Sequence, residues 1–239
     1  MKKRPTLHVL VLILLAASLA CQLPAQLPFQ LPVQIPVQLP ARKQPTPTLV
    51  SSGSLLFEDD FSDRSTGWDS QATPEGIMDY DAGGYRMAVN GEQANFWSTP
   101  GKDLADVRIE VDEGKLSGPD ENRVGLICRS SGSAFYFFII SHDGFYGVGL
   151  FSGDGTTTGE MELIGQNEMQ FSPLINRGIN VNHMRADCSG ETLTLYVNGE
   201  QLAQVKDSRL THGDVGLLAG SFSKPGVDVI FDNFVAIQP

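Results

Sequence analysis

The sequence beyond residue 54 is a succession of short β-type runs, and this feature most constrains the fold. Apolar and polar residues alternate in segments that Gly, Asn, Asp and Pro interrupt. No helical periodicity extends beyond two turns. The runs that we expect to form strands are YRMAV (85–89), VRIEV (107–111), RVGLICR (123–129), FYFFIIS (135–141), FYGVGLF (145–151), INVNHMRADC (179–188), TLTLYV (192–197), QLAQV (201–205), DVGLLAG (214–220) and VDVIFDNFVAI (227–237).

Two turn sequences predict antiparallel hairpins. Asn198-Gly199 joins TLTLYV to QLAQV, a pairing typical of a two-residue type I′ turn. His142-Asp143-Gly144 predicts a second hairpin between FYFFIIS and FYGVGLF. Consecutive hairpins in a chain with 25 glycines favour two curved antiparallel sheets packed face to face. We therefore predict one all-β domain, a β-sandwich, over residues 51–239.

Charge divides the chain into a basic leader and an acidic body. Residues 51–239 carry all 28 acidic side chains and 12 of the 17 basic ones, a formal charge of −16. Phosphate backbones would repel such a body, so we expect no nucleic-acid partner.

The leader predicts export. Lys2, Lys3 and Arg4 precede an apolar run, Val9–Ala20, that is typical of a signal peptide over residues 1–20. The residues Ser18-Leu19-Ala20-Cys21 resemble the lipobox of bacterial lipoproteins, although that family prefers Leu where this chain has Ser18. The resemblance implies a protein held at the outside of the cell membrane by a lipid on Cys21. The alternative is a secreted protein cut after Ala20, with Cys21 a free thiol.

A proline-rich repeat follows the cysteine. Residues 21–41 repeat Gln, Leu or Ile, Pro, and Ala, Phe or Val, with proline at positions 24, 28, 32, 36 and 40. This spacing excludes a helix or a central strand, and it favours an extended linker over residues 21–50. At ~3.1 Å per residue, the 27 residues from Gln22 to Thr48 reach roughly 80 Å. The alternative is a β-like segment whose apolar side lies along a membrane or a partner.

The two remaining cysteines, Cys128 and Cys188, lie in predicted strands. Outside the cytoplasm we expect them to form a disulfide. Two separately buried thiols are the alternative.

Several segments together resemble the concanavalin A-like lectin/glucanase superfamily, in its laminin G-like and 3-keto-disaccharide hydrolase-like branch. They are FEDDFSD, GLICR, FYFFIISHDGFYGV, LTLYVNGEQL and the closing GDVGLLAGSFSKPGVDVIFDNFVAIQP. The resemblance covers about residues 55–238 and implies a jelly roll in which the first strand (FEDDF) and the last (IFDNF) lie close together. It also implies a structural calcium ion, for which Asp60 and Asp232 are the candidate ligands. Alternatively, these two acids cap turns or pair with arginine.

Catalytic patterns are incomplete. A glucanase of this superfamily needs three acids at alternate positions of one strand. Here Glu110 and Asp112 share a face, but the third position is Gly114 and Glu113 points the other way. No histidine spacing fits a metal enzyme, and we expect no enzymatic activity.

A sugar site needs exposed aromatic rings with polar neighbours. Trp97, Arg129, Tyr136 and Tyr146 are the candidates, because their strands would form one sheet; core packing is the alternative for each aromatic. The predicted function is a non-catalytic binding or adhesion module for carbohydrate. A spacer or sensor module that contacts an envelope protein, and a glycoside-active enzyme with an unrecognised site, are the alternatives.

Overall fold

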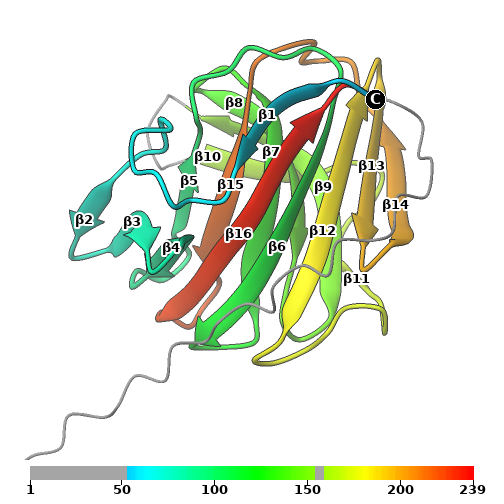
Figure 1. Cartoon of the computed structure of the whole chain (residues 1–239). Coiled ribbons are helices and arrows are strands. Elements are labelled where there is room, and N and C mark those ends of the chain that lie inside the picture. Colours follow the sequence, from blue (N-terminus) through cyan, green and yellow to red (C-terminus); the bar gives the residue numbers. More distant parts are fainter. Residues whose placement is uncertain (1–52, 154–158) are drawn as a thin grey trace, which may run out of the picture. The chain divides into compact units, whose positions relative to one another are not determined.

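The computed structural model describes residues 53–153 and 159–239 as an all-β domain (Figure 1). Sixteen strands occur in these residues, all in antiparallel pairs, in two sheets. The described residues contain no helix that is long and apolar enough to cross a membrane. The predicted signal peptide, Cys21 and the predicted linker lie outside them.

The two sheets, here sheet A and sheet B, have nine and seven strands. Sheet A has the order β14 (Glu200–Lys206), β13 (Thr192–Val197), β12 (Val181–Ser189), β6 (Val107–Ser117), β16 (Val227–Ile237), β4 (Gly84–Val89), β3 (Gly76–Asp81) and β2 (Gln71–Thr73), with β1 (Leu55–Asp59) also on β16. Sheet B has the order β10 (Gly159–Leu163), β9 (Phe145–Gly153), β8 (Ala134–Ile140), β7 (Asn122–Ser130), β15 (Asp214–Ser221) and β5 (Asn95–Ser98), with β11 (Gln170–Phe171) also on β9.

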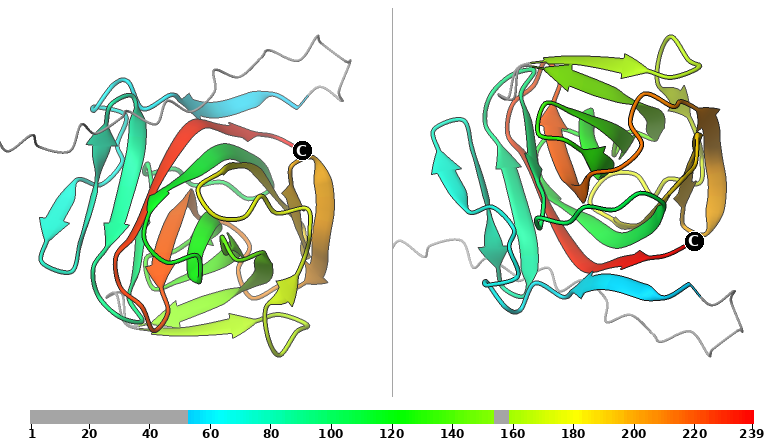
Figure 2. Two further views of the ribbon diagram at one scale, coloured as in Figure 1. Left: turned by 90° about the horizontal axis from the view of Figure 1, so that it is seen from below. Right: turned by 90° about the horizontal axis from the view of Figure 1, so that it is seen from above.

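The sheets pack face to face in a curved sandwich. In the end-on views, β6 and β16 of sheet A bend around the strands of sheet B (Figure 2). Between the sheets lies the main hydrophobic cluster, to which both contribute, including Met87, Val111 and Phe231 from sheet A and Leu126 and Phe138 from sheet B. All strands and both hydrophobic clusters lie within residues 55–237, so this part of the chain forms a domain with a core of its own. The predicted jelly-roll β-sandwich is confirmed.

The terminal strands are neighbours, as the resemblance implied. β1 pairs with the last part of β16, with Asp59 opposite Phe234. The chain therefore enters the sandwich at the end where β16 finishes. The opposite end holds the start of β16 and the end of β6, where Asp228 faces Ser117, and β7 starts there after a loop of four residues.

Local predictions are also confirmed. Val197 pairs with Glu200, and Asn198 and Gly199 both have positive φ, 54° and 90°, as a type I′ turn requires. The His142-Asp143-Gly144 turn joins β8 to β9. Cys128 of β7 and Cys188 of β12 form a fully buried disulfide that links the two sheets.

Candidate binding site

The face of sheet B that is turned away from sheet A carries a second hydrophobic cluster. Along β8, Tyr136 and Phe138 belong to the main cluster, whereas Phe135, Phe137 and Ile139 alternate with them and belong to the second. The second cluster draws its buried residues from sheet B alone. Side chains therefore cover much of the face on which a sugar would be expected.

The sheet is curled enough for strands that are not neighbours to meet across this face. Trp97 of β5 packs on Phe135 and Phe151, with ring centroids 5.2 and 5.0 Å apart, and these two rings stack at 4.7 Å. Glycines make room for the rings. A Cβ on Gly149 would lie 2.3 Å from the Phe137 ring. Any residue other than glycine at this position would therefore force the ring or the strand to move.

A pocket of about 340 Å³ remains on this side of sheet B. Phe137 and Ile139 from the second cluster form part of an apolar lining with the side chains of β10 and its following loop. The rim is polar. The lining residues are Gln93, Asn95, Arg123, Phe137, Ile139, Gly159, Met161, Leu163, Met169 and Phe222, among which there is no carboxylate and no histidine.

The loop before β5 is fixed against the end of β15, and this places the rim. The buried Ser221 hydroxyl donates to the carbonyl oxygen of Gly91 at 2.6 Å and accepts the N–H of Ala94 at 3.2 Å. Gln93 has a positive φ of 51°, and its N–H donates to the carbonyl oxygen of Phe222 at 2.7 Å. These hydrogen bonds hold Gln93 and Phe222, two residues of the pocket rim, beside each other.

Among the described residues, Arg123 of β7 is the one charged residue that lines this pocket. Its guanidinium carbon lies 4.1 Å from the centroid of the Phe222 ring, and Nη1 donates to Oδ1 of Asn95 at 2.5 Å. Burial lowers the pKa of Arg123. Sequence analysis missed this residue, because an arginine near the start of a strand has no local pattern that distinguishes it from any exposed arginine.

The four predicted sugar-site residues do all lie in sheet B, but they do not form one site. Trp97 is half-buried in the second cluster. Tyr146 is half-buried against the main cluster. Tyr136 is fully buried between the sheets, where its hydroxyl donates to Asp207 at 2.6 Å. Burial raises the pKa of this phenol.

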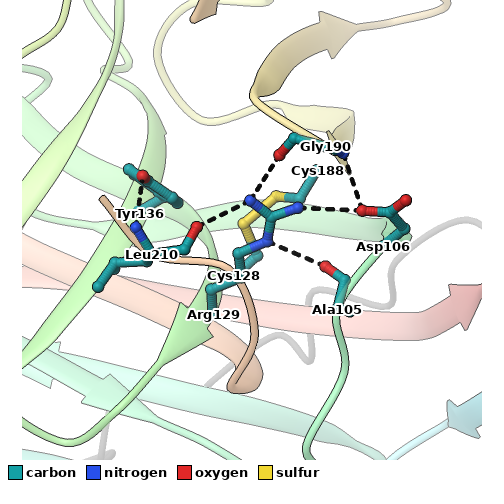
Figure 3. Close-up of a disulfide and its surroundings, with 8 residues drawn as sticks. All are labelled: Ala105, Asp106, Cys128, Arg129, Tyr136, Cys188, Gly190 and Leu210. Carbon is teal, nitrogen blue, oxygen red and sulfur yellow. Dashed lines mark hydrogen bonds and ion pairs between the residues drawn. A yellow bond between two sulfur atoms is a disulfide. The ribbon is translucent and has the colours of Figure 1, made fainter. Parts of the chain in front are cut away.

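Arg129 clamps one end of the sandwich beside the disulfide (Figure 3). Only 1% of its surface is exposed. Nε donates to the carbonyl oxygen of Ala105 at 2.9 Å, and Nη1 donates to those of Gly190 and Leu210 at 2.8 and 2.9 Å. Nη2 lies 3.1 Å from Oδ1 of Asp106. Because its donors bind loops of this domain, we leave Arg129 out of the candidate site.

A second pocket, of about 530 Å³, lies between the β5–β6 and β14–β15 loops. Its charged side chains already have partners. His212 lies 2.7 Å from Asp103, and Asp214 accepts the N–H groups of Gly101 and Lys102 at 2.8 Å each. This pocket is the weaker candidate, since a ligand would compete with these bonds.

The predicted calcium ligands lie near each other. The pKa of Asp232 is raised by burial and, to a lesser extent, by the negative charges of Asp112 and Asp60. Oδ1 of Asp60, however, accepts the N–H and hydroxyl of Ser62, and Oδ1 of Asp232 accepts the N–H of Asn233. Within residues 53–153 and 159–239, no group of three or more His, Cys, Asp or Glu side chains could hold a metal ion. Calcium at Asp60 and Asp232 therefore stays a prediction, which unfolding with added calcium or with a chelator would test.

Glu110 and Asp112 share a face, as predicted, and that face of sheet A is turned away from sheet B. Both flank His183, with Asp112 at 2.7 Å and Glu110 at 3.4 Å from its ring nitrogens. These hydrogen bonds, with Asp112 the stronger partner, raise the pKa of His183 to about 9. The acids thus stabilise a cation on the sheet surface, and neither lines the sheet B pocket.

Glu113 points into the space between the sheets. Sequence analysis assigned it no role. Its Oε2 lies 3.3 Å from Nε2 of His142, and both side chains are fully buried. Asn182 donates to the other carboxylate oxygen at 2.9 Å. This pair joins sheet A to the β8–β9 turn.

Comparison with known proteins places the fold. No protein-family model and no curated protein matches the sequence. The structure is similar to carbohydrate-binding module CBM66 from Bacillus subtilis, with a TM-score of 0.55, 16% identity, and coverage of 72% of this chain and 96% of that one. It is also similar to a Bacillus subtilis protein of unknown function with a galectin-like fold, with a TM-score of 0.56, 12% identity, and coverage of 79% and 97%.

The fold is a jelly-roll β-sandwich of the kind found in these proteins. A Bacteroides ovatus GH16 protein of a mixed-linkage glucan locus, solved with its product, has a TM-score of 0.50 at 10% identity and covers 77% of this chain and 99% of that one. Both binding modules and enzymes therefore share this architecture. At such identities the similarity establishes the fold, and the function has to be inferred from the site.

Proposed function

We propose that this protein is a carbohydrate-binding module that acts outside the cytoplasm, with the sheet B pocket as its site. The observation that carries the proposal is the combination of an apolar lining with amide and guanidinium groups at the rim. A sugar ring offers C–H faces to apolar and aromatic side chains and hydroxyl groups to polar ones. Similarity of fold to a carbohydrate-binding module supports the proposal.

The size of the pocket favours a short ligand. Its volume of about 340 Å³ lies near the lower limit of small-molecule pockets, ~300–1,000 Å³. The second hydrophobic cluster fills the neighbouring part of the same face. We therefore expect the site to take a chain end or a short oligosaccharide, and not a long polysaccharide laid across the sheet.

The composition of the lining supports binding without catalysis. Glycoside hydrolysis generally uses two carboxyl groups on either side of the scissile bond. Among the described residues, those lining the pocket include no Asp, Glu or His. The expected result is sugar binding with no release of reducing ends from the same glycan.

The leader suits a tethered module. Residues 18–21 resemble a lipobox and precede the predicted linker, so a lipid on Cys21 would hold the domain at the membrane. Replacing Cys21 with alanine should release the protein from the membrane fraction and abolish fatty-acid labelling, and unchanged membrane association would refute the anchor.

The binding proposal is tested on residues 50–239, produced oxidised, with a glycan array followed by titration calorimetry. We expect at least one glycan to bind. Its affinity should fall about tenfold in Phe222→Ala, because an aromatic contact contributes about 1 kcal/mol or more to binding. The matched control is His212→Ala in the second pocket, which should leave the affinity unchanged. No binding to any glycan at millimolar concentration would overturn the proposal and favour a spacer module.

A further inference from the structure

We propose that the pocket selects a sugar that carries a carboxylate, such as a uronic acid, and that the guanidinium of Arg123 binds this group. The inference rests on the proposed function and names the class of ligand. It follows from the charge, the free donors and the orientation of one side chain.

The charge of Arg123 has no carboxylate partner in the described part of the chain. Six of the eight arginines there form a salt bridge with a carboxylate; Arg123 and Arg177 do not. Arg177 is exposed to water, whereas Arg123 is partly buried, and burial lowers its pKa. An arginine nonetheless stays charged, so partial burial without a counter-ion costs free energy. A bound anion would offset that cost.

The free donors of Arg123 lie on one edge of the guanidinium. Nη1 is used, since it donates to Oδ1 of Asn95 and lies 3.8 Å from the sulfur of Met161. Nε and Nη2 donate to no described residue. These two groups point in the same direction and form the fork that binds both oxygens of a carboxylate.

The same protein contains an occupied example of this fork. Nε and Nη2 of Arg86 donate to Oδ1 and Oδ2 of Asp228, each at 2.8 Å. Arg123 lines the pocket, and no described carboxylate occupies the equivalent edge of its guanidinium. A carboxylate on the ligand would complete the arrangement that Asp228 completes for Arg86.

Two neighbours fix the orientation of the Arg123 fork before a ligand arrives. The Phe222 ring lies against the guanidinium face, with 4.1 Å from its centroid to the guanidinium carbon. Asn95 holds the opposite edge through Nη1. A donor pair that is already oriented loses less conformational entropy on binding. The rim amides of Gln93 and Asn95 then remain for the hydroxyl groups of the sugar.

The experiment compares matched oligosaccharides of one linkage that end in glucose, in glucuronic acid or in 6-sulfated glucose. Titration calorimetry on residues 50–239 should give an affinity for the glucuronate about tenfold or more above that for the glucose form. Arg123→Gln should bring this ratio close to one, and Arg123→Lys should restore part of it because charge returns without the fork. Arg177→Gln is the matched control and should keep the wild-type ratio.

Each outcome separates the two proposals. Equal affinity for the glucose and glucuronate forms overturns the inference while the carbohydrate-binding function stands, and so does a preference that survives in Arg123→Gln. Tighter binding of the sulfated form overturns the assignment to a carboxylate. Binding to none of the three, nor to any other glycan, overturns the proposed function itself. Thermal unfolding of each variant shows whether it is folded. If Arg123→Gln does not fold, the ratio of glucuronate to glucose affinity is read from Arg123→Lys instead.

Discussion

Replacing Arg129 with methionine removes a buried cation that ties separate segments of the domain together. The methionine side chain fills a volume similar to that of arginine but donates no hydrogen bond. The carbonyl oxygens of Ala105, Gly190 and Leu210 lose a charged donor, and Asp106 loses its ion-pair partner. These groups come from the β5–β6 loop, the β12–β13 turn and the β14–β15 loop, so the change loosens one whole end of the sandwich (Figure 3).

The magnitude follows from the burial of the Arg129 guanidinium. A hydrogen bond to a charged group contributes about 1.5–3 kcal/mol, but removing arginine also removes its own cost of burial. Asp106 is half-exposed, so the main cost is that of three carbonyl oxygens left without their donor, about 1–3 kcal/mol each, or about 3–5 kcal/mol net. We expect that loss in the free energy of unfolding of Arg129→Met. For a domain of this size it corresponds to a fall in Tm of roughly 6–20 °C.

Urea unfolding of residues 50–239, followed by the fluorescence of Trp68 and Trp97, measures the effect. Arg64→Met is the control, because Arg64 pairs with Asp79 at the surface and 60% of its side chain is exposed. Water and salt screen that exposed pair, so it should contribute little to stability. If Arg129→Met loses no more stability than Arg64→Met, the interpretation of Arg129 as a structural clamp is wrong.

Two other properties of the domain can be checked by unfolding. Reducing the Cys128–Cys188 disulfide, which spans 60 residues, should lower the free energy of unfolding by about 4 kcal/mol, and an unchanged urea midpoint in reductant would contradict this. His183 has a pKa raised to about 9, so its contribution to stability is complete below about pH 6.5 and is lost as the pH rises toward 9. His183→Gln should therefore flatten the dependence of Tm on pH in that window, and a profile that keeps the wild-type slope would show that the Asp112 and Glu110 pairings contribute little.

The sequence predicted those parts of the fold in which short-range pattern and packing agree. β13 and β16 have the predicted bounds, and the FYFFIIS run is the buried β8 because both of its faces are apolar. Asn198-Gly199 fixed its turn because both residues tolerate positive φ. The short strands β2, β3, β5, β10 and β11 were missed, since two to six residues carry too few alternations to be distinguished from loops.

The candidate site could not be read from the sequence, because no local spacing connects its residues. Gln93, Arg123, Met161 and Phe222 lie on different strands and loops, and the curl of sheet B brings them together. Arg129 was a candidate because its strand was expected to share a sheet with those of Trp97, Tyr136 and Tyr146, and it does lie in that sheet. The sequence could not show that its guanidinium donates to the carbonyl groups of neighbouring loops.

The most direct test of the central claim is a crystal structure of residues 50–239 with the best glycan from the array. We predict that a sugar ring lies in the sheet B pocket against Phe222, with its hydroxyl groups at Gln93 and Asn95 and an anionic group at Arg123. A sugar bound in the second pocket, beside Asp103 and His212, would contradict the account.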